Sequence, residues 1–465
     1  MNKLTLKSIA LFFVISLCSN YLHSQEISGQ WNGLLSIQGQ SLRLVFHISQ
    51  TSDGYASTMD SPDQGASGIS VASTTFDGVQ LEIKMPNMGL LYQGEFKTDS
   101  IVGTFTQGAL SLPMMLKRAT EPITPILRPQ EPKPPFPYRS EDVFFENKCA
   151  KEVTLAGTLT LPATGSNFTA VVLITGSGAQ NRDEEIMGHK PFLVIADFLT
   201  RNGIAVLRFD DRGFGQSTGN FATATTADFA TDVQSAIDYL KSRNEINPQK
   251  IGLMGHSEGG VIAPMVAANS SDVAFIVMLA GTGIRGDALL LLQQEAIYRV
   301  SGVPEEQISK IKKSNAKIFD HIVNANNILS TQDIMDFIAT LDPQILPDGM
   351  TTNNFQQFAN QISTPWMLYF LRYDPAPALQ KVKCPVFAIN GSKDLQVTAK
   401  ENLDAIRAAL IKGGNQKATI KEYPGLNHLF QECTTGSPTE YAAIEETFSP
   451  VVLKDLCDWI LSLTF

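Results

Sequence analysis

Cysteine is scarce in this sequence, with 5 residues in a chain of 465, and none of them stands in a C-x-x-C spacing. A small disulfide-held fold and a metal or redox motif of that type are therefore excluded. Charged residues are also few, at 18%, with a net charge of −10 and no long basic run that would neutralise a series of phosphates. Nucleic acid is therefore not an expected partner. The 43% of hydrophobic residues is typical of an ordinary globular protein.

Long apolar runs are also missing beyond the N-terminus, so we expect no integral membrane segment. Residues 1–24 resemble an export signal, because lysines precede an apolar run over residues 9–18 that is too short to cross a bilayer. We expect cleavage near Ser24 and a periplasmic or extracellular location. A lipid anchor on Cys18 is the alternative, which the bulky Leu17 before it disfavours.

Four cysteines remain after removal of this signal, namely Cys149, Cys384, Cys433 and Cys457. Disulfides persist outside the cytoplasm, and four cysteines allow three different pairings. The sequence does not select one of these pairings, and scattered free thiols are an equal alternative. The oligomeric state is open as well.

Residues 25–119 have the pattern of a small all-β domain. Apolar residues alternate with polar ones over 42–48, turn signals follow, and further short strands are indicated near 81–85, 92–96 and 101–105. We predict a small antiparallel barrel or sandwich. Such a domain can hold a ligand with Trp31 at its mouth, but a domain of about 90 residues usually fills its interior with side chains, which is the interpretation we favour.

Residues 120–138 contain seven prolines and form a linker. This composition cannot sustain a helix or a central strand, so it predicts a stiff interdomain spacer. A strap packed along the surface of one domain is the alternative.

Residues 139–465 change to short apolar strands separated by helices. Continuous apolar runs over 171–174, 204–209, 251–254, 275–279 and 386–389 indicate strands that are buried on both faces, as in a parallel sheet. An apolar stripe from Phe229 to Leu240 at helical spacing indicates a helix on that sheet. The pattern predicts a doubly wound α/β fold, interrupted over about 283–382 by a helical cap.

The strongest chemical motif is the G-x-S-x-G sequence of residues 255–259. It follows the predicted strand 251–254 and precedes a stretch, 261–268, that is compatible with a helix. In a strand-turn-helix context this motif presents a serine at the sheet edge, so Ser257 is the candidate nucleophile.

A serine nucleophile needs a histidine as its general base and a carboxylate that orients this histidine. Of the 6 histidines, only His428 lies downstream in the catalytic sheet, in a loop after the strand-like residues 418–423. Asp394 follows the strand 385–389 through a turn and is the best candidate acid. Asp374 and Asp404 are weaker candidates. Asp374 precedes Pro375 where the chain exits the predicted cap, and Asp404 falls within a predicted helix.

The oxyanion of such a reaction needs backbone donors. The N–H of Glu258, directly after the nucleophile, is one candidate. The loop from Thr175 to Gly178 follows the first long strand and supplies the other, with Ser177 preferred and Gly178 as the alternate. This loop lacks the pattern of a P-loop or a dinucleotide fingerprint, and no metal-ligand cluster is evident, so we expect no cofactor.

These motifs, together with Asp210-Asp211-Arg212-Gly213 and Asn390-Gly391-Ser392-Lys393-Asp394, resemble the α/β-hydrolase superfamily. The nearest branch is that of secreted bacterial carboxylesterases, often labelled serine-aminopeptidase-like hydrolases. The resemblance covers about residues 140–465 and, more weakly, the small β domain. It implies the same triad of Ser257, Asp394 and His428. Thr175 stands where the family often has histidine.

The sequence therefore predicts a serine hydrolase that cleaves a small-molecule carboxylic ester through an acyl-enzyme. A peptidase or amidase with the same triad is the first alternative, and a non-enzymatic binding protein is the second. The acyl and alcohol specificity is open. Asp211 and Arg212 either contact substrate or, as we favour, form a salt bridge that fixes their loop.

Overall fold

The computed structural model describes residues 27–37, 40–62, 66–107, 110–119 and 127–464, so the predicted signal lies outside the described residues. Contacts divide the chain into two compact units, one formed mainly by the residues up to 121 and the other mainly by those from 122 onward. Each unit is described by itself. None of the described helices is long and apolar enough to cross a membrane.

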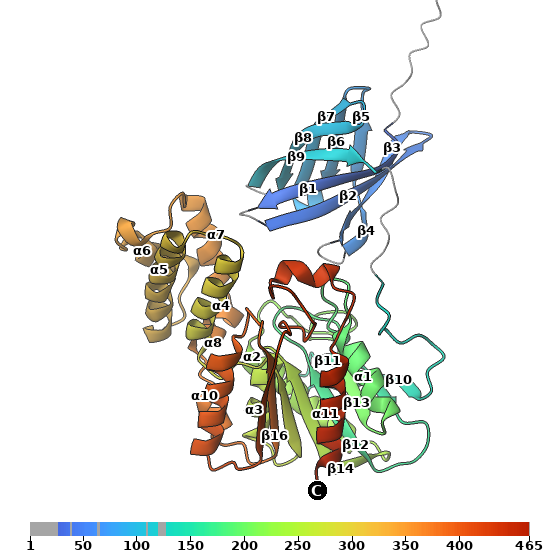
Figure 1. Ribbon diagram of the computed structural model, residues 1–465, viewed down its shortest axis with the longest axis vertical. Helices are drawn as coiled ribbons and strands as arrows, with labels where there is room; N and C mark the ends of the chain where they lie inside the picture. Colours follow the sequence, from blue (N-terminus) through green and yellow to red (C-terminus); the bar gives the residue numbers. More distant parts are fainter. Residues whose placement is uncertain (1–26, 38–39, 63–65, 108–109, 120–126, 465) are drawn as a thin grey trace, which may run out of the picture. The chain divides into compact units, whose positions relative to one another are not determined.

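The first unit is a closed antiparallel β-barrel (Figure 1). Its strands run in the order β2-β1-β9-β8-β7-β6-β5-β3-β4, and an additional pairing of β2 with β3 closes the barrel. The strands are β1 (Gly29–Ile37), β2 (Gln40–Thr51), β3 (Gly54–Ser61), β4 (Ala66–Ser70), β5 (Ser73–Phe76), β6 (Gln80–Met85), β7 (Leu90–Lys97), β8 (Ser100–Gln107) and β9 (Leu110–Arg118), with a 3-10 turn at Pro86–Met88.

Aromatic side chains fill the interior of this barrel. Trp31 is 0% exposed, packs edge-on against Phe96 at 5.9 Å, and donates its Nε1 hydrogen to the carbonyl of Ile27 at 2.7 Å. Tyr92 is fully buried and donates its hydroxyl hydrogen to the Ile101 carbonyl at 3.0 Å. The alternative that placed Trp31 at the mouth of a ligand site is therefore wrong, because the indole is part of the core.

The described part of the linker, residues 127–138, is a strap on the second unit. Arg128 donates hydrogen bonds to four backbone carbonyls, those of Met187, Gly188, Ala442 and Ile444. Gln130 accepts from the N–H of Thr447 and of Phe448. These bonds fix this half of the linker, so that it is a strap and not a free spacer.

The second unit is built on an eight-stranded sheet of order β10-β11-β13-β12-β14-β15-β16-β17. The pairs of β11 with β10 and β13 are antiparallel, and the remaining pairs are parallel. The strands are β10 (Arg139–Glu146), β11 (Thr154–Leu161), β12 (Phe168–Ile174), β13 (Ala205–Phe209), β14 (Ile246–His256), β15 (Phe275–Leu279), β16 (Val386–Gly391) and β17 (Ala418–Tyr423). The five apolar runs of the sequence coincide with five of these strands, except that Ile204 directly precedes β13.

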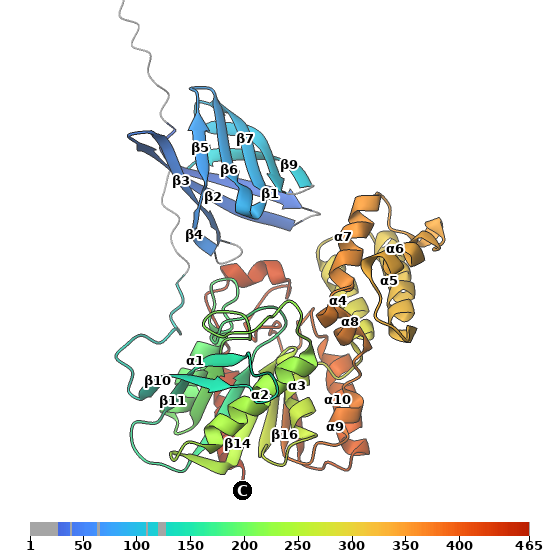
Figure 2. The same ribbon diagram turned by 180° about the vertical axis from the view of Figure 1, so that it is seen from behind.

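Helices cover both faces of the sheet (Figure 2). One apolar core joins the sheet to α1 (Pro191–Arg201) and α11 (Pro450–Ser462). The other core joins it to α2 (Thr226–Lys241), α3 (Gly259–Ala267) and α10 (Ala399–Lys412). Alternate strand residues such as Val171 and Val172 belong to opposite cores, as the two-residue period of a strand requires.

A helical cap is inserted between β15 and β16, as predicted, and is drawn in yellow and orange in Figure 1. Its own apolar cluster includes Ile322, Ile334 and Leu371. The helices are α4 (Gly286–Val300), α5 (Glu305–Asn324), α6 (Thr331–Ala339), α7 (Thr352–Ile362), α8 (Pro365–Arg372) and α9 (Ala376–Leu379), with 3-10 turns at Pro343–Ile345 and, after β17, at Pro438–Ala443. The four cysteines Cys149, Cys384, Cys433 and Cys457 are free thiols.

Candidate active site

Ser257 lies in a tight turn between β14, which ends at His256, and α3, which begins at Gly259. Its backbone φ of 52° is in the left-handed region, which residues other than glycine seldom adopt. A Cβ on Gly255 would lie 1.9 Å from the carbonyl oxygen of Gly259. Only glycine therefore fits at position 255, and the turn has the backbone geometry of a nucleophile elbow.

Asp394 and His428 come together at the ends of β16 and β17. His428 Nδ1 lies 2.7 Å from Asp394 Oδ2, and both side chains are almost fully buried. The other oxygen of Asp394 accepts the N–H groups of Gln396 and Val397, each at 2.8 Å. This arrangement holds the carboxylate in one orientation and leaves Nε2 of the imidazole free of that bond.

The loop of His428 lies against the elbow. The backbone carbonyl of His428 accepts a hydrogen bond from Nε2 of His256 at 3.0 Å, and the two imidazole centroids are 4.7 Å apart. His256 directly precedes Ser257 in the chain. The structure thus brings the predicted base loop next to the predicted nucleophile, although their sequence positions are 171 residues apart.

The loop from Thr175 to Gly178 also lies against the nucleophile. A Cβ on Gly176 would be 3.2 Å from the Cβ of Ser257. The N–H of Gly176 points away from the site, because it donates to Glu184 Oε1 at 2.7 Å. Among the described residues, the N–H groups of Ser177 and Glu258 donate to no other protein group. The two N–H groups that the sequence proposed as donors thus have no partner within the described part of the protein.

Two buried carboxyls flank this loop. Asp211 accepts the hydroxyl hydrogen of Thr175 at 2.7 Å and the N–H of Gln180 at 2.8 Å. Burial raises the pKa of Asp211 to about 8, in spite of these two donors. Asp211 therefore fixes the loop that contains Thr175 and Gln180.

Glu258 is the second of these carboxyls, and burial raises its pKa as well. Its Oε1 accepts from the hydroxyl of Thr226 at 2.6 Å and from the indole nitrogen of Trp366 at 2.8 Å. Trp366 belongs to α8. The residue after the nucleophile thus joins α2 and the cap through one carboxylate oxygen.

Arg212 has a structural role. It forms a two-point ion pair with the buried Asp232, with Nε to Oδ2 at 2.7 Å and Nη2 to Oδ1 at 2.9 Å. The salt bridge that we favoured for this loop is thus present on Arg212, whereas Asp211 makes a different set of contacts.

The two weaker candidates for the triad acid lie elsewhere. Asp374 is exposed and caps the start of α9 through the N–H of Ala376. Asp404 is exposed on α10, where it pairs with Lys400 and Arg407.

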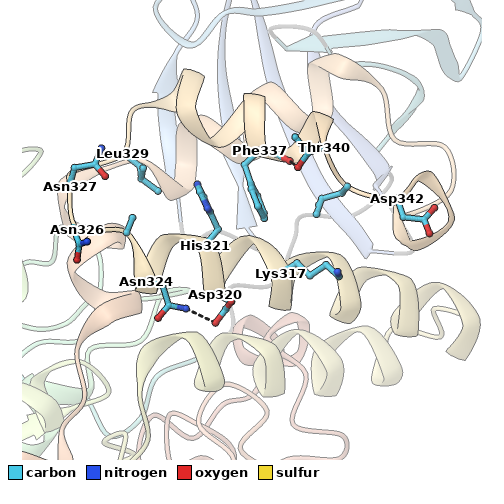
Figure 3. Close-up of a pocket in the computed structure, with 12 residues that line it drawn as sticks. Lys317, Asp320, His321, Asn324, Asn326, Asn327, Leu329, Phe337, Thr340 and Asp342 are labelled. Carbon is cyan, nitrogen blue, oxygen red and sulfur yellow. Dashed lines mark hydrogen bonds between the residues drawn. The ribbon is translucent and has the colours of Figure 1, made fainter.

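A groove of about 750 Å³ lies in the cap between α5 and α6 (Figure 3). His321 lies against Phe337 there, with ring centroids 4.0 Å apart, and Asn324 bonds to Asp320. None of the predicted catalytic residues lines this groove. Its size therefore does not make it the reaction site.

A smaller, mainly apolar groove of about 480 Å³ lies beside α8. Its lining includes Thr225, Pro365, Tyr369 and Tyr373. Thr225 and Pro365 directly precede Thr226 and Trp366, the two residues that bond to Glu258. This groove therefore shares two chain segments with the contacts of Glu258, although Glu258 itself does not line it. The described part of the chain contains no group of three or more His, Cys, Asp or Glu side chains that would hold a metal ion.

The fold and the elbow together define the class of the second unit, the α/β-hydrolase fold, as the sequence predicted. The family described as serine aminopeptidase, S33, matches residues 191–432. This is more than half of the chain, and the protein belongs to that family.

Individual proteins match this chain at low sequence identity or over a part of its length. The chain is 25% identical to esterase EstD of Thermotoga maritima over 285 residues, which are 61% of this chain and 60% of EstD. It is 34% identical over 127 residues to the uncharacterized protein YfhR of Escherichia coli, covering 27% of this chain and 41% of YfhR. The esterase Pf2001 of Pyrococcus furiosus has a similar structure, with a TM-score of 0.41 and 16% identity over 70% of this chain and 92% of that one.

Sequence reasoning missed three side chains that shape the site, namely Glu184, Thr226 and Trp366. Each contacts a residue that is distant in sequence, His256 in the case of Glu184 and Glu258 in the case of the other two, and none stands in a motif. The sequence assigned no role to His256, although its ring contacts Glu184 and the loop of His428. No local pattern identifies such contacts, because they depend on the packing of separate loops.

Proposed function

We propose that this protein is a serine hydrolase that cleaves carboxylic esters through an acyl-enzyme, with Ser257 as nucleophile, His428 as general base and Asp394 as the orienting acid. The observation that carries the proposal is the buried pair of His428 and Asp394, whose loop is bonded to the residue before the left-handed Ser257. Membership of the family and the likeness to EstD, which is named an esterase, support it.

In the proposed reaction His428 Nε2 takes the hydroxyl proton while Ser257 Oγ attacks the ester carbonyl. The N–H groups of Ser177 and Glu258, with Gly178 as the alternate, stabilise the resulting oxyanion. Collapse of this intermediate releases the alcohol, which takes the proton from His428, and leaves an acyl group on Ser257. Water then attacks the acyl group with His428 again as base, which releases the acid and restores the serine.

We expect the ester to carry an apolar group of moderate size. The apolar groove beside α8 is formed in part by α8, whose Trp366 bonds to Glu258, and most of its lining side chains are aromatic or aliphatic. Tyr369→Ala should therefore raise KM for esters with longer chains more than for the acetate.

The direct test is hydrolysis of p-nitrophenyl esters, from acetate to octanoate, by the wild type and by Ser257→Ala. Loss of a triad nucleophile typically lowers kcat by about a millionfold. We expect an active wild type, burst release of p-nitrophenol and an inactive variant. An equally active Ser257→Ala would contradict the proposal.

Amide hydrolysis is the second candidate, because the family is described by a serine aminopeptidase. The same triad serves either leaving group, so amino-acid p-nitroanilides should be compared with the esters on the same enzyme. A higher kcat/KM for the anilides would replace the esterase assignment. Binding of esters without turnover would favour the binding-protein alternative.

We also propose that the protein is exported, on the basis of residues 1–24. N-terminal sequencing of the protein from the culture medium or periplasm tests this. A mature chain that begins near residue 25 is the expected result, and an intact Met1 on cytoplasmic protein would contradict it.

A further inference from the structure

A second buried histidine–carboxylate pair lies next to the proposed triad. His256 Nδ1 is 2.9 Å from Glu184 Oε1, and the two residues are 7% and 2% exposed. Neither residue has a role in the reaction proposed above. The pair nevertheless lies beside the proposed triad, because His256 directly precedes Ser257 and its ring lies against the ring of His428.

The hydrogen bonds of His256 are all satisfied when both ring nitrogens carry protons and Glu184 is a carboxylate. The Nε2 atom faces the backbone carbonyl of His428 at 3.0 Å, and a carbonyl oxygen only accepts. The Nδ1 atom faces Glu184 Oε1, which already accepts the N–H of Gly176 at 2.7 Å. A neutral imidazole beside a carboxylate would leave one lone pair directed at an oxygen. The arrangement therefore fits an imidazolium paired with a carboxylate.

The electrostatic surroundings agree with this protonation state. Burial alone lowers the pKa of His256, but the charge and hydrogen bond of Glu184 outweigh it, and the pKa is raised. Three further groups surround the pair. The charge of Asp394 also favours the imidazolium form of His256, the ring of His428 lies against it, and Asp211 interacts with Glu184.

The pair connects three segments that are far apart in sequence. Glu184, in the left-handed region at φ 51°, holds the oxyanion loop through Gly176. It also holds the elbow through the ring of His256, which in turn holds the base loop through the carbonyl of His428. Removal of this single carboxylate would therefore loosen the donors, the nucleophile and the base relative to one another.

We propose that Glu184 and His256 are positioning residues, which lock the oxyanion loop, the nucleophile elbow and the loop of the general base into one unit and keep a positive charge against the ring of His428. This inference rests on the proposed serine-hydrolase function.

The test is Glu184→Gln, measured by hydrolysis of a p-nitrophenyl ester. The amide oxygen of glutamine can still accept two hydrogen bonds, but it lacks the negative charge that stabilises a doubly protonated His256. A neutral ring beside this amide oxygen keeps only one of its two hydrogen bonds, either to residue 184 or to the carbonyl of His428. We expect kcat to fall about 10- to 100-fold, as for a small misplacement of reacting groups, with KM changed less than about threefold.

Asp232→Asn is the matched control. It also removes a buried carboxylate that pairs with a cation, Arg212, but it touches none of the three loops. We expect a loss of stability with kcat changed less than about threefold. An unchanged kcat in Glu184→Gln, or an equal loss of kcat in Asp232→Asn, would overturn the inference.

Nuclear magnetic resonance of the ¹⁵N-histidine-labelled wild type gives a readout that does not depend on turnover or on the folding of the glutamate variant. We expect one buried imidazole with both nitrogens protonated at pH 8, assigned to His256 by its absence in His256→Gln. A neutral His256 with one proton would overturn the inference. Failure of the proposed function is distinct from both results, because the wild type would then react neither with esters or anilides nor, at Ser257, with a fluorophosphonate probe.

Discussion

The barrel and the carboxyl edge of the large sheet use buried polar groups in opposite ways. In the barrel, Trp31 and Tyr92 each bury a polar atom that bonds to a backbone carbonyl of the same unit, and the buried side chains among its described residues carry no ionisable carboxyl or basic group. At the sheet edge the chain buries several carboxyl side chains, including Glu184, Asp211, Glu258 and Asp394.

The difference shows where burial of polar groups costs folding free energy and is nevertheless present. Burying a carboxyl is unfavourable unless it is paired or protonated, so a cluster of buried carboxyls beside a left-handed serine indicates a site under functional demand. The barrel has the composition of a stable, filled core. Within the described residues, the comparison therefore assigns the chemistry to the hydrolase unit, and the following predictions test that assignment.

The largest effect is expected at Asp394. Asp394→Asn keeps an oxygen for the N–H groups of Gln396 and Val397 but removes the charge that stabilises the imidazolium of His428. By analogy with other serine triads, kcat should fall by about 10⁴-fold, measured with p-nitrophenyl acetate.

Asp404→Asn is the control for that experiment, because Asp404 was a rival for the same role and is exposed on α10. We expect its kcat to remain within about twofold of the wild type. A larger loss in Asp404→Asn than in Asp394→Asn would remove the assignment of the triad acid.

Much of the hydrolase fold could be predicted, because buried parallel strands have a simple signature. The predicted strand 275–279 and the observed β15 have the same bounds, and the cap insertion falls where the rhythm of strands and helices stops. The first two strands were not predicted. β10 carries charged residues at an edge of the sheet, and β11 contains Gly157, so neither has the apolar run of a central strand.

The site could be predicted only in part. Ser257, Asp394 and His428 follow from motif and chain order, since strand ends meet at one sheet edge. Glu184 and Trp366 follow from no such rule, because their partners are set by the paths of a long loop and of the cap. The linker illustrates the same limit. Its prolines indicate an extended path, whereas the bonds of Arg128 that make it a strap depend on loops about 60 and 315 residues away.

The next largest effect is expected in the barrel. Trp31→Ala removes a fully buried indole and should lower the free energy of unfolding of that unit by about 3–5 kcal/mol. Far-ultraviolet circular dichroism in urea measures this change without using tryptophan as the probe. Leu34→Ala, on the same strand but 52% exposed, should cost less than about 1 kcal/mol. The rate of Ser257 modification by a fluorophosphonate should be unchanged in both. A large loss of that rate in Trp31→Ala would show that the barrel takes part in the chemistry.

The smallest effect concerns the pH dependence that Asp211 gives to stability. Its pKa is raised by burial to about 8 in the folded state, against an ordinary value of 3.8, so the folded protein keeps a proton that the unfolded chain has lost. The free energy of unfolding therefore falls as pH rises through this interval, by at most about 1.4 kcal/mol per pH unit from this one group.

Asp211→Asn removes this dependence, whereas the contribution of Glu258, which has the same sign, remains in both proteins. The difference in unfolding free energy, wild type minus variant, should therefore decrease by about 1–2 kcal/mol between about pH 5.5 and 7 in urea titrations. A difference that is constant with pH would mean that Asp211 is ionised when folded. The oxyanion loop would then be held by a charged carboxylate, and the contrast with the barrel would be sharper still.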